Sequence, residues 1–437
     1  MIIKIKKYLK KLFIAITFNC ILFTSFYGQK ITFYHDVFPI IQKNCSPCHS
    51  KNSSAPFGLL TYKDVAPRAR QIQKVIDSGV MPPWPADAGY QSFQNERILS
   101  EKEKKLIGNW IGSGMKKGVP NLFKKKENHS KSKDSKPEII LMVPDSFIVN
   151  KSLKDQFARF YFPNLVENDI EIGSFKFYSG NPEIVHHMEI WNCVPDSNAF
   201  EPGLKNPKIE IKDDLALTSH LTQTDNFISG ILPGNLEESY PEGISVLLPK
   251  NSVMLALIHY APVLTENKIQ SKILLYKSKN PALRYAQTIS ILNNKDKMLN
   301  GPLFIPANSI KEFHSVKVIE ADFSAFAVMP HAHQLCKNFF SFAINPEGDT
   351  IPIVRINSWN FQWQFLYRFK EFKVFPAGTE IHVMATYDNT SNNFQNPFNP
   401  PRDVGTSNRA QDEMMALFLI GVPFKSGDRG KILNYGQ

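Results

Sequence analysis

Cys45-Ser46-Pro47-Cys48-His49 is the stretch of this 437-residue chain whose residue types and spacing most clearly specify chemistry. The pattern Cys-x-x-Cys-His is typical of covalent c-type haem attachment. Each thiol would add to one haem vinyl group, and His49 would ligate the iron from the proximal side. A chance disulfide or a thioredoxin-like redox pair is the alternative. Because the motif follows an export signal, and c-type haem is attached outside the cytoplasm, we predict one covalent haem at Cys45 and Cys48.

The sixth ligand of the iron is expected to be a methionine, because a soft thioether favours ferrous iron and raises its reduction potential. Met81 and Met115 are the only methionines between the haem motif and the charged linker described below. Met81 is followed by two prolines, which restrict the backbone, whereas Met115 lies in a glycine-rich helix end. We therefore predict His49 and Met81 as axial ligands. The alternative is that Met81 packs against Trp84 and leaves the iron open.

The second half of the chain holds histidines and a methionine that could ligate metal. Two strand residues separated by one lie on the same face, about 7 Å apart, which suits one metal ion. Adjacent histidines point to opposite faces, so they share a metal only at a bulge or a strand end. Any one of these histidines alone is more simply a packed or hydrogen-bonded side chain, but their paired grouping favours metal. The group consists of His186, His187, His259, His331, His333 and Met414.

The first 28 residues have the pattern of an export signal. Five lysines precede the apolar stretch 12–26, which ends near the small residue Gly28. We predict a secretory signal over residues 1–28, cleaved near Gly28. A retained membrane anchor is the alternative, but the apolar run is short for the roughly 20 residues that a span needs. The protein is expected to be exported, periplasmic or secreted, with membrane contact only if this segment is retained.

The net charge of +11 comes from two short stretches. The signal carries five lysines and no acidic residue, and residues 116–137 carry eight lysines against two acidic residues. The remainder is near neutral, so no basic groove for nucleic acid is expected. Residues 123–137 form a charged Lys/Ser linker that is too polar to pack, with an expected reach of roughly 20 Å.

These motifs need two kinds of scaffold. Around the haem motif, apolar residues at helical spacing predict one helix over 33–43 and another that begins at a capping box of Ser100 and Glu103. Residues 30–122 thus resemble a small class I cytochrome c, in which two helices cross over the haem. Residues 138–430 instead consist of short apolar runs broken by turn signals, which indicates an all-β architecture.

The all-β region resembles the copper type II, ascorbate-dependent monooxygenases, the family of peptidylglycine and dopamine β-hydroxylating enzymes. The resemblance implies two tandem eight-stranded jelly-roll-like sandwiches, here 138–278 and 279–430, each bringing one copper to a solvent-filled cleft. The expected fold is therefore multidomain, with a small all-α cytochrome c domain before two tandem all-β jelly-roll-like sandwiches. The matching pieces, in family order, are HHM at 186–188, PEG and LPKNSVMLALIHY within 241–260, HAH at 331–333, WNFQWQ at 359–364, YDNT at 387–390 and DEMM at 412–415.

The resemblance also divides the ligands between two coppers. The first copper would take three histidines and pass on one electron. The second would take two histidines and a thioether, a soft ligand that favours Cu(I), and in the family this copper binds O₂ where a substrate C–H bond is broken. The first set would be His186, His187 and His259; the second, catalytic set would be His331, His333 and Met414, with Met415 or no methionine as the alternative.

Departures from the peptide-amidating members bear on the substrate. Where those members hold a substrate carboxylate with an arginine, a polar group and a phenolic group, this chain has Met329, Ala416 and Phe418. A small, uncharged, non-carboxylate substrate is therefore expected. Cys193 and Cys336 are the only cysteines outside the signal and the haem motif, and in an oxidising compartment they could form a disulfide.

The sequence predicts a copper-dependent monooxygenase that hydroxylates a C–H bond of a small molecule with O₂. Its cofactors would be one haem c and two copper ions. Electrons would enter through the haem from an external donor, either ascorbate or a redox protein. Two other functions stay open: a haem and copper electron-transfer protein without oxygenase activity, and a binding module whose β-domains hold no copper.

Overall fold

The computed structural model describes most of the chain after the predicted export signal. The predicted linker lies outside the described residues except for residues 136 and 137, and so do the side chains of His186 and Cys193. The described residues are 31–50, 53, 55–120, 136–144, 147–153, 155–162, 166, 168–193, 208–210, 226–231, 237–250, 252–278, 280–293, 296–407 and 411–435.

Residues 31–120, called the helical part below, hold all the helices of the described chain. The predicted capping box is present, because Ser100 Oγ accepts from the Glu103 N–H and the Glu103 carboxylate accepts from the Ser100 N–H. Phe33 and Trp110 are fully buried with ring centroids 5.7 Å apart. No helix of the described residues is long and apolar enough to cross a membrane. The elements are η1 (Phe33–Val37), α2 (Phe38–Asn44), α3 (Tyr62–Val65), η2 (Ala66–Arg68), α4 (Ala69–Asp77) and α5 (Glu101–Gly112).

The first β unit is built from two larger sheets and one short pair. One sheet has the order β1-β12-β4-β9-β13 with β8 added beside β4, the other has the order β6-β3-β10-β5-β7, and β11 pairs with β2. The strands are β1 (Ile139–Met142), β2 (Ile148–Val149), β3 (Gln156–Phe162), β4 (Ile170–Tyr178), β5 (Val185–Cys193), β6 (Lys208–Glu210), β7 (Asn226–Ile231), β8 (Glu237–Ser239), β9 (Ile244–Leu248), β10 (Val253–Tyr260), β11 (Asn267–Lys268), β12 (Lys272–Lys277) and β13 (Arg284–Tyr285).

The second β unit consists of two antiparallel sheets. Their orders are β14-β22-β17-β20 and β15-β16-β21-β18-β19. The strands are β14 (Gln287–Leu292), β15 (Lys297–Met298), β16 (Ile310–Val318), β17 (Phe323–Ala332), β18 (Cys336–Ile344), β19 (Thr350–Ile356), β20 (Tyr367–Phe375), β21 (Glu380–Asp388) and β22 (Met415–Pro423). The prediction that the second half is β-rich, with several sheets, is therefore confirmed.

The two β units share a core. Met188 and Ile190 of β5 belong to the same buried cluster as Phe326 and Phe418 of the second unit. A separate cluster fills the space between the two sheets of the second unit. Since β13 still pairs with β9 of the first unit, the chain passes between the units at residue 286, a few residues beyond the expected boundary at 278.

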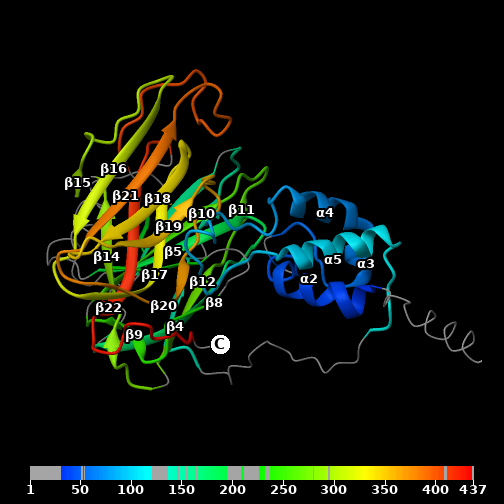
Figure 1. Ribbon diagram of the computed structural model, residues 1–437, viewed down its shortest axis with the longest axis horizontal. Coiled ribbons are helices and arrows are strands. Elements are labelled where there is room, and N and C mark those ends of the chain that lie inside the picture. Colours follow the sequence, from blue (N-terminus) through cyan, green and yellow to red (C-terminus); the bar gives the residue numbers. More distant parts are fainter. Residues whose placement is uncertain are drawn as a thin grey trace, which may run out of the picture.

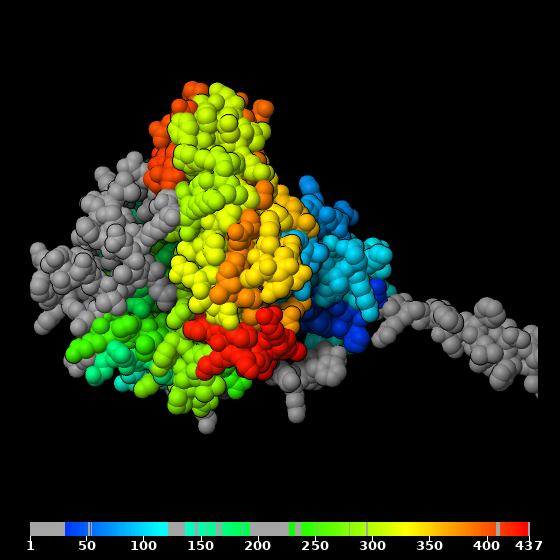
Figure 2. All heavy atoms as spheres, turned by 60° about the vertical axis from the view of Figure 1, so that its left-hand side comes forward, coloured from blue at the N-terminus to red at the C-terminus, as the bar shows by residue number. Residues whose placement is uncertain are grey.

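The helical part lies at one end of the β body, on the right in Figure 1. Figure 2 shows its blue and cyan atoms pressed against the yellow and orange atoms of the second β unit. The contact is made by residues 84–97, called the docking segment below. Within it, Ala86 and Phe93 form bridges to Ile356 and Phe369, and both side chains are buried in the core of the second unit. The helical part therefore belongs to the same folded body.

Candidate haem-attachment motif and metal centres

The Cys-x-x-Cys-His residues form a tight turn at the end of α2. The Cys48 and His49 N–H groups both donate to the Cys45 carbonyl, at 3.2 and 2.9 Å. This turn brings both sulfurs and the imidazole close together, as the spacing requires. Cys45 and Cys48 are both reduced thiols, and burial raises the pKa of Cys45 to about 12. The structure therefore holds two protonated thiols side by side rather than a disulfide.

His49 is oriented by its own loop. Its Nδ1 lies 3.0 Å from the Phe57 carbonyl, and its ring centroid lies 4.9 Å from that of Phe57. A hydrogen bond from Nδ1 to a carbonyl leaves the Nε2 lone pair for a metal. Burial lowers the pKa of His49, which favours the neutral form that ligation needs. The donor set of two thiols and a fixed neutral imidazole fits a c-type haem.

The two candidate methionine ligands stand in different settings. Met115 packs against the core of the helical part, at the end of α5, with a left-handed backbone (φ 53°). Met81 lies in the turn that follows α4, half-buried, where its N–H donates to the Val75 carbonyl at 3.1 Å. Met115 thus contributes to the packing of the helical core, whereas Met81 is not part of that core.

His187 and His259 sit opposite each other on paired strands. Their Nδ1 atoms are 3.3 Å apart, on β5 and β10, and both side chains are buried. Two imidazole nitrogens bound at 2.0–2.1 Å to one tetrahedral ion would lie roughly 3.3 Å apart. Asp155 Oδ1 lies 3.0 Å from the other nitrogen, Nε2, of His259, an arrangement that orients metal-bound histidines. Phe157 stacks on the His259 ring at 4.3 Å. The pair fits a metal ion.

A β-bulge lies at His186. His259 pairs with His187, but the next residue of β10, Tyr260, pairs with Val185, so His186 is an extra residue in β5. A bulge re-aims side chains that strict alternation would send to opposite faces. This is the condition under which adjacent histidines can share one metal.

His331 and His333 lie at the end of β17, with ring centroids 5.3 Å apart. His333 Nδ1 is 2.8 Å from the Asp412 carbonyl, which leaves its Nε2 for a ligand. One Glu413 oxygen accepts from the N–H groups of His333, at 3.0 Å, and Met414, at 3.3 Å. The buried Glu413 carboxyl therefore fixes the two chain segments that carry the second ligand set.

Strand register separates the two candidate methionines. Ala332 pairs with Met415, and His331 pairs with Ala416. Met415 is fully buried in the core of the second unit, on the sheet face opposite to His331 and His333. Met414, one residue earlier, falls on the histidine face by alternation and is half-buried. Of the two, Met414 is placed to complete the second ligand set.

The two histidine groups face each other from different units, and Phe361 lies between them. Its ring centroid is 5.7 Å from that of His259 and 6.0 Å from that of His333. Glu189, two residues beyond His187 on β5, places an oxygen 3.8 Å from His331 Nδ1. Sequence reasoning quoted the WNFQWQ stretch around Phe361 only as part of the family match. Its position between the two groups depends on a loop path that no local pattern specifies.

Burial sets the charge state around the second histidine pair. It raises the pKa of Glu189 to about 7 and that of Glu413 to about 8, and it lowers the pKa of His331 to about 4. The side chain of Gln364 hydrogen-bonds to His331 and partly opposes the lowering of the His331 pKa. His331 is thus neutral at pH 7, which is the form that binds metal.

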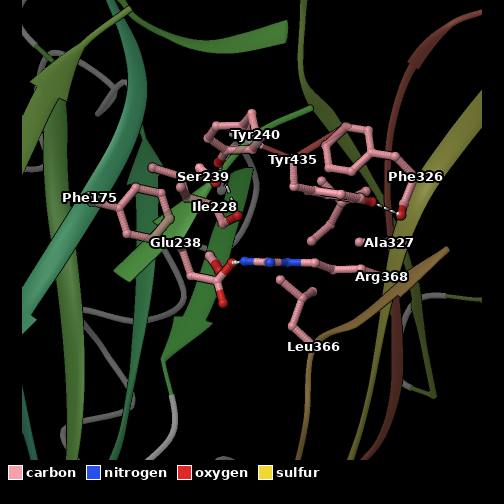
Figure 3. Close-up of a pocket in the computed structure, with 12 residues that line it drawn as sticks. Phe175, Ile228, Glu238, Ser239, Tyr240, Phe326, Ala327, Leu366, Arg368 and Tyr435 are labelled. Atoms are coloured by element: carbon pink, nitrogen blue, oxygen red, sulfur yellow. Dashed lines mark hydrogen bonds and ion pairs between the residues drawn. The ribbon is translucent and has the colours of Figure 1, made fainter. Parts of the chain in front are cut away.

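A small cavity between the two β units is shown in Figure 3. Arg368 of β20 reaches across it to Glu238 of β8, and both side chains are buried. Tyr435 donates from its hydroxyl to the Phe326 carbonyl at 2.6 Å. With a volume of about 10 Å³, the cavity has room for about one water molecule. The residues that line this cavity connect the two β units, and the cavity is too small to hold a substrate.

The side chain of Cys193 lies outside the described residues, so of the possible disulfide pair only Cys336 can be described. It is a reduced thiol, fully buried in the core of the second unit, and its Sγ contacts the Asn338 carbonyl at 3.3 Å. Cys193 ends β5 of the first unit.

Among the described residues, no cluster of three His, Cys, Asp or Glu side chains has the arrangement of a metal site. Each proposed set contributes only two such described residues, because its third member is either the His186 side chain or a thioether.

No family model and no curated protein matches the chain. Structural matches include infectious bursal disease virus Gt strain (10% identity, 70% of this chain and 86% of the other, TM-score 0.15). They also include the CBM22-1-CBM22-2 tandem domain of Paenibacillus barcinonensis Xyn10C (9%, 65% and 82%, 0.17). Similarity this low carries no functional argument.

Proposed function

We propose that the protein is an exported copper-dependent monooxygenase that hydroxylates a C–H bond of a small molecule, with electrons supplied through a covalent haem c. The observation that carries this proposal is the pair of histidine groups on facing sheets, with His187 and His259 at the spacing of two ligands on one ion. The docked Cys-x-x-Cys-His unit supports the haem. When bound, the coppers would supply one-electron redox chemistry and O₂ activation, and the haem would supply electrons.

The first site would consist of His186, His187 and His259. The Asp155 carboxylate holds the His259 ring through Nε2, so that Nδ1 faces the ion. Phe157 and Phe361 cover the His259 ring and exclude water from that side. A rigid, desolvated set of imidazoles changes little in geometry when one electron is gained or lost, which suits transfer.

The second site would consist of His331, His333 and Met414. Glu413 and the Asp412 carbonyl fix the backbone and the ring of His333. The Met414 thioether would favour the reduced ion, which is the form that reacts with O₂. The net reaction would place one oxygen atom in the substrate and the other in water, and it consumes two electrons and two protons.

The substrate is expected to lack a carboxylate. Met329 and Phe418 are buried where the two units meet, and Phe418 packs against Trp191 and Phe227 with centroid distances of 5.3 and 4.9 Å. A carboxylate placed there would be desolvated without a cationic partner, at a cost of several kcal/mol. An uncharged small molecule that reaches the ligands from the Met414 side agrees best with this packing.

Metal content tests the proposal. The mature protein, made with haem maturation and dialysed against copper, should contain one haem and two coppers. His331→Ala should retain one copper, and His259→Ala should also retain one. A substrate screen by O₂ uptake would follow. One haem with no tightly bound copper would contradict the oxygenase and leave a cytochrome fused to a binding module. Two coppers that cycle without any substrate-stimulated O₂ uptake would instead indicate an electron-transfer protein.

A further inference from the structure

The docking segment fixes the helical part to the second β unit by apolar contacts. Phe93 lies with its ring centroid 4.9 Å from Tyr367 and 5.6 Å from Phe369, and it is 1% exposed. Trp84 meets the edge of Tyr367 at 5.1 Å. These contacts attach the docking segment to the second β unit.

Polar contacts hold the same segment in one register. Gln94 donates its N–H to the Arg368 carbonyl at 2.7 Å, and the Asn95 side chain accepts from the Arg368 N–H at 3.0 Å. Asp87 accepts from Arg355 Nε and Nη2, at 3.0 and 2.8 Å. These backbone and side-chain hydrogen bonds fix the register of the docking segment on the second β unit, and with it the start of Arg97.

Arg97 ends the docking segment and touches the haem-attachment motif. Its Nη1 donates to Cys48 Sγ at 3.8 Å, and its guanidinium carbon lies 5.5 Å from the centre of the Phe365 ring. Phe365 is buried and stacks against Trp363 with nearly parallel rings. The Arg97 side chain thus contacts both the Cys48 sulfur, which would bind the haem, and the Phe365 ring.

The chain that contains Phe365 continues to both histidine groups. Four residues earlier, Phe361 lies between His259 and His333. Gln364 donates from Nε2 to the Phe361 carbonyl at 2.9 Å, and its side chain hydrogen-bonds to His331. Residues 361–365 therefore contact at one end the Arg97 side chain that touches the haem motif, and at the other end described members of both ligand sets.

We propose that residues 361–365, entered through Arg97, form a fixed electron route from the haem to the metal sites. The proposal rests on the haem and copper sites of the proposed function. Tunnelling between redox centres is fastest through bonded and closely packed atoms, and this segment supplies both across the whole span. Each passage oxidises one ferrous haem to ferric and reduces one cupric ion to cuprous. The external donor, ascorbate or a redox protein, reduces the haem again between passages, so two passages supply the two electrons of one turnover. The donor is the docked haem of the same molecule.

The route is tested by reoxidation of the haem in full-length, haem- and copper-loaded protein. The ferric, cupric protein is mixed without oxygen with less than one equivalent of dithionite, and the absorbance of ferrous haem is followed. Phe365→Leu and Phe361→Leu should each slow its decay about tenfold or more, at a rate independent of protein concentration. Phe342→Leu, on the outer sheet beside His382, is the matched control and should decay as wild type.

Copper content is measured in every variant. A failure of the electron route can then be told apart from a failure of the proposed function. If wild type binds copper and reoxidises its haem within the molecule, but both phenylalanine variants decay at the wild-type rate, the route is wrong and the proposed function stands. If wild type binds no copper, the proposed function falls.

A copper-free measurement checks the first contact of the route. Arg97→Gln should lower the reduction potential of the haem, because a positive charge beside the Cys48 sulfur favours ferrous iron, and Arg97→Lys should restore most of it. An unchanged potential in Arg97→Gln would show that Arg97 does not contact the haem, and would overturn the route.

Discussion

His187 and His259 turn their Nδ1 atoms toward each other at 3.3 Å across two directly paired strands. Asp155 meets the far nitrogen of His259 at 3.0 Å. A histidine held in this way presents a fixed nitrogen to a metal, and the carboxylate raises its basicity. The geometry of this pair, more than any other feature, links the fold to copper chemistry.

Asp155→Asn should weaken the first copper about 10- to 100-fold, which is the usual cost of removing a carboxylate behind a metal-bound histidine. Competition with a copper chelator measures the affinity, and one of the two coppers should become easier to remove. Glu380→Gln, next to His382 on the outer sheet, is the control and should leave both coppers unchanged. Equal affinities in Asp155→Asn and wild type would show that His259 is not a ligand.

Met414 and Met415 should respond in opposite ways to alanine. Met414→Ala should lose one copper with little change in stability, because its side chain is half-buried at the end of the strand pair. Met415→Ala should keep two coppers but lose about 2–5 kcal/mol of unfolding free energy, because it leaves a cavity in a packed core. Metal analysis and urea unfolding of the copper-free proteins measure the two effects. Copper loss in Met415→Ala alone would reverse the assignment.

The ion pair of Arg368 and Glu238 should hold the two β units together. Glu238→Gln leaves the buried Arg368 charge without its partner and should lower the free energy of unfolding by about 3–5 kcal/mol. Replacing both residues with apolar ones of similar size should recover most of that loss. Glu101→Gln, which removes a surface pair with Lys104, should not move the unfolding midpoint. A Glu238→Gln variant as stable as wild type would contradict a structural role.

Acid should weaken the attachment of the helical part. The hydrogen bonds from Arg355, with that from the Gly89 N–H, hold the pKa of Asp87 below its ordinary value. A carboxyl whose pKa is lowered on folding stabilises the protein above the unfolded pKa of about 3.9, and this contribution is lost as the pH falls through the lower folded value. Asp87→Asn should therefore be less stable than wild type near neutral pH, and the difference should shrink toward about pH 3. Urea unfolding across this range measures it, and a difference that does not depend on pH would count against the ion pair.

Much of the fold and of the site could be predicted from the sequence because the signals are local. The capping box of Ser100 and Glu103 depends on residues three apart, and the common face of His331 and His333 follows from the period of a strand. From the sequence, adjacent His186 and His187 could share a metal only at a bulge or a strand end. Whether a bulge is present depends on the pairing of β5 with β10, which the local sequence does not specify.

The contacts that join the parts of the protein could not be predicted in the same way. Phe93 and Phe361 lie in irregular segments, where no periodicity shows which way a side chain points. Phe93 enters a core built mainly from residues about 200 or more positions later in the chain. The sequence predicted a polar linker of roughly 20 Å reach after residue 122, which gave no sign that the docking segment attaches the helical part to the second β unit.

The burial of Phe93 in the core of the second β unit limits which parts of the protein can fold when they are produced separately. Because Ala86 and Phe93 of the helical part belong to that core, the second β unit lacks part of its interior when it is produced alone. A β body cut free of residues 84–97 would expose the faces of Tyr367 and Phe369, and a grafted cytochrome without this segment would have nothing to fill the gap. The helical part is thus not an exchangeable module, and new partners would have to be acquired by changing its surface in place.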